Sequence, residues 1–357
     1  MNLIPKIRSS VFKFVMQLIF ALLFANCLTP VDIPTKRLGN RLVVSGQISP
    51  LEDQNIIQLG RTADTERLPI LLSGASITLS DDLGANYSYI EDLAHIGTYV
   101  LSGVSGIPGR TYHIQIELPT GEIYNSKPEK MPEKVGKLST HYELIKEEFV
   151  DSEGTVVTQP FIKIYANTIL PENNFMKWTV QEVYILSPTD FPDPFGYTPP
   201  SCFISQNADP QRITLVDGTV LKASSITNLL IGSRIIDYSF WERHYFTIYQ
   251  SSLTKEANEF WQKVNILANQ KGSIFDTPPA EITGNIYNVN NPSEKVFGYF
   301  QAVNQIFDRF YVLNYDLPFP LLWTKCTFDN RDYLLYPQRC LDCLIVRNSS
   351  YNRPSWF

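Results

Sequence analysis

The residues with the clearest chemical possibilities in this sequence are the cysteines. Cys340 and Cys343 form a Cys-x-x-Cys pair, and Cys202 and Cys326 precede them. Such a pair supplies half of a four-thiolate zinc site, but the chain has no second pair of this kind and no thioredoxin-like βαβ pattern around this one. In an oxidising compartment, an even number of cysteines favours structural disulfides. We therefore expect disulfides among these four residues, with their pairing open and zinc as the alternative, and we assign no metal or cofactor.

The sequence contains no recognisable motif for acid–base or nucleophilic catalysis. Its four histidines, His95, His113, His141 and His244, stand in no metal-ligand spacing such as HExxH. Gly-Val-Ser-Gly at residues 103–106 lacks the spacing of the nucleophile elbow, and there is no phosphate-binding loop. We therefore predict no catalytic residue. The alternative is a pair of carboxylates brought together by folding, which a sequence cannot reveal.

The fifth cysteine, Cys27, follows a leader of the signal-peptide type. A short basic region precedes an apolar run at residues 14–25. This run is shorter than the ~20 residues of a membrane-spanning helix, so residues 1–26 are expected to be a signal peptide. A cysteine directly after such a run is typical of a lipobox, in which the thiol is acylated. We expect a lipid anchor at Cys27 and an extended tether over residues 27–39, with ordinary cleavage and a soluble product as the alternative.

Composition excludes one class of partner and indicates a class of fold. The net charge is −6 and no cluster of Lys and Arg supplies phosphate neutralisation, so we expect no nucleic-acid binding. Aromatic residues make up 13% of the chain, which also has 24 prolines, as is usual for a β-rich exported protein. The length predicts two domains after removal of the leader.

Short strands at regular spacing are expected between residues 40 and 127. Residues 74–80 and 112–118 both alternate apolar and polar side chains, the pattern of a strand with one buried face. About seven such strands, with turns roughly every 8 to 12 residues, are typical of an Ig-like or prealbumin-like β-sandwich. The charged, proline-containing segment 128–137 then predicts a linker.

The C-terminal domain, residues 138–357, is expected to be β-rich with one amphipathic α-helix near residues 254–270. Thr254 is a suitable N-cap, and apolar residues recur after it at helical spacing. The fold class predicted for the whole chain is therefore mainly β, with two β-sandwich domains and one amphipathic helix in the second.

Loops of two kinds are expected in the C-terminal domain. Asp217 and Gly218 predict a tight turn inside a hairpin over residues 212–221. Two proline-rich segments carry aromatic residues on stiff loops, which suit contact with a partner. The partner-contact candidates in these segments are Phe195, Tyr197, Phe319 and Trp323.

Residues 251–300 carry most of a resemblance to a known family. They contain SLTKEA and FW within the expected helix, then GSIFD, GNIYNVNNP and VFGYF. Cys-Leu-Asp-Cys at residues 340–343 and Pro-Ser-Trp at residues 354–356 follow. With these features the chain resembles the DUF4249 family of Bacteroidetes outer-membrane lipoproteins, whose biochemical role is undefined. The N-terminal pattern also looks like the carboxypeptidase-regulatory-like modules of the same phylum.

The resemblance implies a lipid-anchored protein of the outer membrane that associates with a TonB-dependent receptor or another barrel protein. We accordingly expect a non-enzymatic binding or accessory subunit, with its ligand and the membrane face it occupies left open. The alternatives are an exported hydrolase acting on glycan or peptide, and an adhesion or structural module. The neighbouring gene would separate the first hypothesis from the other two.

Overall fold

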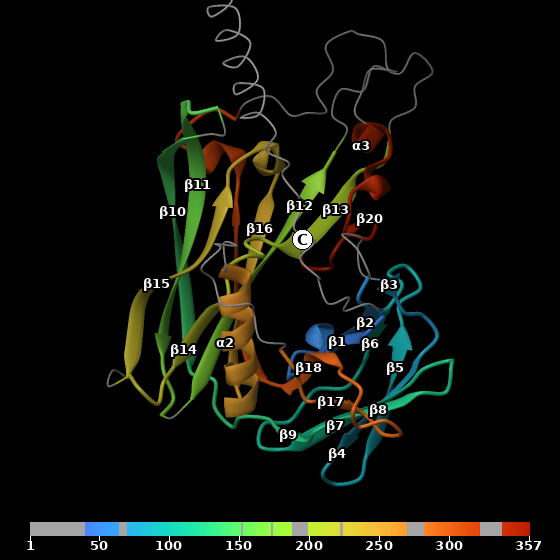
Figure 1. Ribbon diagram of the computed structural model, residues 1–357. Coiled ribbons are helices and arrows are strands. Elements are labelled where there is room, and N and C mark those ends of the chain that lie inside the picture. Colours follow the sequence, from blue (N-terminus) through green and yellow to red (C-terminus); the bar gives the residue numbers. More distant parts are fainter. Residues whose placement is uncertain are drawn as a thin grey trace, which may run out of the picture. The chain divides into compact units, whose positions relative to one another are not determined.

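Strands account for most of the residues that the computed structural model describes. The described residues are 40–63, 70–150, 153–172, 174–187, 199–221, 224–269, 282–321 and 338–357. All of them fall within one compact unit, Gly39–Phe357, and their strands form three sheets (Figure 1). The fold is mainly β and sandwich-like, as predicted. None of the helices formed by these residues is long and apolar enough to cross a bilayer.

The first sheet contains eleven strands in the order β17-β8-β7-β4-β5-β6-β2-β1-β18, with β3 beside β2 and β9 beside β7. The strands are β1 (Leu42–Ile48), β2 (Ile56–Arg61), β3 (Ile70–Leu71), β4 (Ser76–Asp81), β5 (Asn86–Glu91), β6 (Thr98–Val100), β7 (Thr111–Glu117), β8 (Ile123–Ser126), β9 (Glu129–Lys130), β17 (Ile286–Asn288) and β18 (Phe297–Ala302). The two end strands, β17 and β18, contact each other, so the sheet is nearly closed around its core. Ile77 and Leu79 on β4 and Ile114 and Ile116 on β7 are buried there, which confirms the predicted alternation.

Residues 286–302 lie far along the chain but complete this first sheet. Strand β18 pairs in parallel with β1, with Gly298 opposite Val44, and β17 pairs with β8. Gly298 has a φ of 91°, and a Cβ there would lie 1.8 Å from the Val44 carbonyl oxygen, so this approach requires glycine. The expected boundary at residues 128–137 places these strands in the C-terminal domain. In the structure β18 covers an edge of β1, and β17 covers an edge of β8, that would otherwise be unpaired.

The other two sheets enclose a second core, which forms the sandwich expected for the C-terminal part. One sheet consists of β10 (Lys137–Val150), β11 (Val156–Ile169) and β15 (Ser225–Ile235). The other has the order β19-β16-β12-β13-β20, with β14 beside β12, and consists of β12 (Phe175–Leu186), β13 (Cys202–Asn207), β14 (Thr214–Asp217), β16 (His244–Leu253), β19 (Asn304–Val312) and β20 (Ser349–Ser350). Ile164, Trp178 and Phe246 are buried in this core, which draws side chains from both sheets.

Helix α2 (Lys255–Asn269) begins where the sequence predicts. The Thr254 hydroxyl accepts a hydrogen bond from the Ala257 amide at 3.1 Å, as an N-cap does. Ala257 and Phe260 are buried in a small core that includes residues of β16 and β18. The helix contacts β12, β14 and β18, and Figure 1 shows it lying along the six-stranded sheet. Short helical turns are η1 (Glu52–Gln54), η2 (Tyr238–Phe240), η3 (Asn314–Asp316), α3 (Gln338–Leu341) and η5 (Cys343–Ile345).

The hairpin expected over residues 212–221 does not form. Strand β14 pairs with the beginning of β12, and Gly218, which follows it, does not have a positive φ. The Gly218 amide donates a hydrogen bond to the Asn174 carbonyl oxygen at 2.8 Å, and a Cβ at Gly218 would lie 2.6 Å from that oxygen. Glycine is needed here for a close approach to Asn174, just before β12, whereas the hairpin prediction assumed a left-handed turn.

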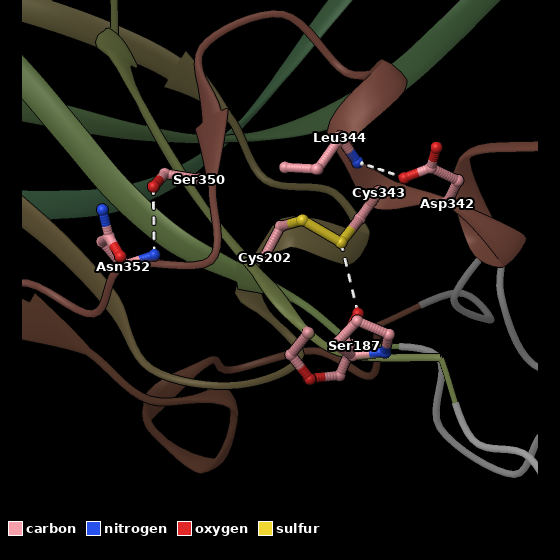
Figure 2. Close-up of a disulfide and its surroundings, with 9 residues drawn as sticks. Ser187, Cys202, Asp342, Cys343, Leu344, Ser350 and Asn352 are labelled. Atoms are coloured by element: carbon pink, nitrogen blue, oxygen red, sulfur yellow. Dashed lines mark hydrogen bonds between the residues drawn. A yellow bond between two sulfur atoms is a disulfide. The ribbon is translucent and has the colours of Figure 1, made fainter. Parts of the chain in front are cut away.

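One disulfide attaches residues 338–357 to the six-stranded sheet (Figure 2). It joins Cys202, at the start of β13, to Cys343, with the two Cα atoms 5.8 Å apart. Strand β20 pairs with β13 next to this bond. The predicted use of cysteines in disulfides is confirmed for this pair, whereas Cys326 and the side chain of Cys340 lie outside the described residues.

Removing this disulfide is expected to lower the free energy of unfolding by about 2–4 kcal/mol, because it closes a loop with a sequence separation of 141 residues. Urea unfolding of Cys202→Ala, Cys343→Ala and the double variant measures the effect. The free energy of unfolding should fall by the same amount in all three variants, because each removes the same bond. If the loss in the double variant equals the sum of the losses in the two single variants, the two cysteines contribute independently, which would contradict the pairing.

Candidate functional site

The six-stranded sheet has a polar face opposite the sandwich core. Side chains alternate along β12, so Trp178 lies in the core whereas Lys177 and Gln181 belong to the opposite face. Lys177 and Gln181 line a cavity of about 250 Å³ that also borders strands of the first sheet. The other described residues of its lining are Ser45, Gly46, Gln47, Gln54, Ile56, Gln58, Thr179, Tyr249, Trp261, Tyr299, Gln301 and Gln305. Glutamine is the commonest residue among them, which suits the cavity to hydrogen-bonding a polar molecule.

Lys177 is the one charged side chain among the described residues that line this cavity. It is only 9% exposed, and its Nζ lies 3.7 Å from the centre of the Trp261 ring on helix α2. Burial lowers the pKa of the Lys177 ammonium to about 7. The Trp261 ring stabilises the ammonium through a cation–π contact, but no acidic residue of the described lining neutralises it. The cavity therefore presents an uncompensated positive charge that builds up as the pH falls through about 7.

Hydrogen bonds fix the amide groups around Lys177 in place. Gln301 accepts a hydrogen bond from Trp261 Nε1 at 2.8 Å and donates one to Gln47 Oε1 at 3.0 Å. On the opposite wall, Gln54 donates to the Tyr249 hydroxyl at 2.9 Å. These contacts join helix α2, strands of the first sheet and β16. Because they hold the polar groups in one arrangement, the cavity walls are preorganised.

Other polar groups of the lining are not engaged in this way. Within the described part of the chain, Gln58, Thr179 and Gln181 make no side-chain hydrogen bond, and Gln58 is exposed while the other two are half-buried. They can therefore donate to or accept from a molecule in the cavity without breaking an existing contact.

Tyr299 connects this cavity with a second one of about 570 Å³ beneath helix α2. Its hydroxyl donates a hydrogen bond to Glu129, which also accepts one from the Thr254 hydroxyl at 2.7 Å. Glu129 is only 4% exposed, and burial raises the pKa of its carboxyl group. The segment expected to be a linker, residues 128–137, thus contains a strand, β9, and a buried carboxyl group that binds the start of α2.

A polar cluster in the sandwich resembles a catalytic arrangement, but its His244 and Glu182 side chains are closed to solvent. His244 Nε2 lies 3.0 Å from Glu182 Oε2, and His244 Nδ1 lies 3.2 Å from the Ser239 carbonyl oxygen. Arg234 Nε donates to the same Glu182 oxygen at 2.9 Å. Both ring nitrogens are engaged and His244 is fully buried, stacked 4.0 Å from the Phe240 ring, so the cluster is suited to holding the fold together. Across the described residues, no group of three or more His, Cys, Asp or Glu side chains is arranged to hold a metal.

Only one of the predicted partner-contact residues lies in the described part of the chain. Phe319 is half-buried against the sandwich core, with Lys146 Nζ 5.3 Å from its ring centre. Cys27, Phe195, Tyr197 and Trp323 lie outside the described residues. The structure does not bring Phe319 to the cavity.

Aromatic residues continue along the polar face of the six-stranded sheet beyond the cavity. Trp356 and Phe357 pack on Tyr245, with ring centres 5.2 and 4.8 Å away, and the Arg309 guanidinium lies 3.6 Å from the Trp356 ring centre. Tyr311, next to them, is 46% exposed. The segment attached by the disulfide therefore covers one end of this face and leaves part of it open.

The sequence alone does not identify Lys177 or the glutamines around it as a site. The available signal was the alternation of Lys177, Thr179 and Gln181 with the apolar Met176, Trp178 and Val180. This pattern is also that of an ordinary strand with one solvent-exposed face. Only the packing of α2 and the first sheet over that face turns it into a cavity.

A family model described as a domain of unknown function, DUF4249, matches residues 28–306. This match agrees with the resemblance found at residues 251–300, and every residue that lines the cavity falls within the matched range. No curated protein matches the sequence.

Proposed function

The chain belongs to the DUF4249 family, and from this premise we propose that it is a non-enzymatic binding subunit of the outer membrane. In this proposal the protein is anchored through acyl chains on Cys27 and holds a small polar ligand in the cavity that contains Lys177. It works beside a TonB-dependent receptor or another barrel protein, which takes the ligand up.

The cavity is the observation that carries the binding role. It combines fixed amides, unengaged donors such as Gln181, and an ammonium group on Lys177 that is nine-tenths buried. Binding sites for small molecules typically unite a concave shape with a few convergent polar groups. The described part of the lining offers contacts of this kind, but no pair of acid and base groups for a reaction, which favours binding over catalysis.

The support for anchoring comes from the leader, since an apolar run at residues 14–25 leads directly to Cys27. Acyl chains on that cysteine would confine the protein to the membrane surface and raise its concentration near a barrel partner. The transporter partner itself is proposed from the family resemblance.

Expression of the full chain in its natural host tests this proposal. Wild-type protein should incorporate an alkyne-labelled fatty acid, sediment with outer membranes, and co-purify with a barrel protein after gentle solubilisation. The matched variant Cys27→Ser should lose the label, the sedimentation and the partner. A mature chain with an unmodified amino end in the medium, or a lone species in several detergents, would contradict the proposal.

A further inference from the structure

The charge in the cavity points to a narrower class of ligand than polar molecules in general. Lys177 is buried beside Trp261, and no acidic residue among the described lining offsets it. Burying a charge without a counter-ion is costly, and proteins usually avoid it by pairing the charge. A ligand with one negative charge would supply the missing counter-ion.

We propose that the cavity binds a small hydroxylated carboxylate, of the sugar-acid class, with its carboxylate on Lys177 Nζ. A carboxylate rather than a phosphate dianion fits, because one ammonium group balances one negative charge. The unengaged groups of Gln58, Thr179 and Gln181 are placed to hydrogen-bond the hydroxyls. The volume of about 250 Å³ suits a single small molecule, because drug-sized ligands occupy pockets of roughly 300–1,000 Å³. This inference rests on the ligand-binding part of the proposed function.

Binding should be linked to the protonation of Lys177. Its pKa of about 7 means that the free protein holds a mixture of ammonium and neutral amine near neutral pH. A bound carboxylate favours the ammonium, so the complex takes up protons and its affinity falls as the pH rises above 7. The other titratable residues of the lining are Tyr249, with a pKa raised by burial to about 12, and Tyr299, whose pKa is also raised by burial and by Glu129 behind it. Both phenols stay neutral between pH 6 and 9, so Lys177 dominates the pH response of the lining residues that the structure describes.

Calorimetric titration of the purified full chain with glucuronate, glucose and glucosamine tests the inference. At pH 6.5 glucuronate should bind at least about tenfold more tightly than glucose, and glucosamine more weakly than either. At pH 8.5 the affinity for glucuronate should fall by about tenfold, because most of the free Lys177 is then neutral. At pH 7.5, titrations in buffers of different ionisation enthalpy should reveal proton uptake.

Two variants separate the charge from the rest of the fold. Lys177→Met should lose the preference for glucuronate, whereas Lys255→Met, which removes a lysine that is 70% exposed at the start of α2, should retain it. Equal binding of glucose and glucuronate would overturn the carboxylate assignment while leaving ligand binding intact. Failure to bind glucuronate, or an unchanged preference in Lys177→Met, would also overturn it. These measurements require neither membrane nor transporter, so they are independent of the anchoring test.

Discussion

Replacing Glu182 with alanine is expected to lower the free energy of unfolding by about 3–5 kcal/mol. The Glu182 side chain is 1% exposed, and it accepts hydrogen bonds from Gln206 and Arg234 and pairs with His244. Its removal would leave the Arg234 guanidinium, 16% exposed, without its closest counter-charge. Urea unfolding at pH 7 measures the loss. Glu147→Ala is the matched control, because its ion pair with Lys163 is at the surface and should contribute no more than about 1 kcal/mol.

The same carboxylate should make stability depend on pH in the acid range. Burial alone would raise the pKa of Glu182, but His244 and Arg234 outweigh it, so the pKa lies below its usual value of 4.5. The unfolded chain therefore binds the proton more readily, and the contribution of Glu182 is fully present above pH 4.5 and lost as the pH falls through the folded value. The difference in the free energy of unfolding between wild type and Glu182→Gln should therefore shrink as the pH falls below 4.5. If this difference stays constant from pH 3 to 7, the charge of Glu182 is not the cause of the stabilisation.

Replacing Lys177 with methionine is expected to have the opposite effect to Glu182→Ala, raising the free energy of unfolding by about 3 kcal/mol at pH 7. Burial lowers the pKa of Lys177 from 10.5 to about 7, and each unit corresponds to about 1.4 kcal/mol of cost to the charged folded state. Loss of the cation–π contact with Trp261 offsets about 1 kcal/mol of the gain. Methionine is unbranched and of similar length, so it fills the same space.

The sign of the pH dependence distinguishes this effect from simple repacking. Between about pH 7 and 10.5 the unfolded chain binds more protons at Lys177 than the folded chain does, so wild-type stability rises with pH in this window. The advantage of Lys177→Met should therefore be largest at or below pH 7 and decline toward pH 10. Urea unfolding over that range, with Lys255→Met as the control, measures it. A Lys177→Met variant less stable than wild type at pH 7 would contradict a buried, unpaired charge.

Local features of this fold could be predicted from the sequence because they depend on neighbouring residues. The N-cap at Thr254 and the alternation on β4 and β7 are confirmed, since capping and one-sided burial need only the local pattern. The hairpin at residues 212–221 shows where local reasoning fails. The Asp-Gly signal at its centre was compatible with a turn, but pairing of β14 with β12 determined the outcome.

The candidate site could not be predicted, because it is made by contacts between distant parts of the chain. Lys177, Gln47 and Gln301 come from three strands that are separated by more than a hundred residues and meet only in the folded protein. In the sequence Lys177 is one lysine among 30 basic residues. Lys177 is buried because α2 and the first sheet pack against one face of β12. The sequence pattern of β12 itself does not indicate what covers that face.

The parallel pairing of β1 with β18 has a consequence for biosynthesis. The ribosome makes β1 early, but the partner strand ends only at Ala302, so the N-terminal half cannot finish folding while it emerges. During that interval β1 presents an open edge that can pair with other nascent chains. Export before folding, with chaperones shielding that edge until translation is complete, would suit such a topology.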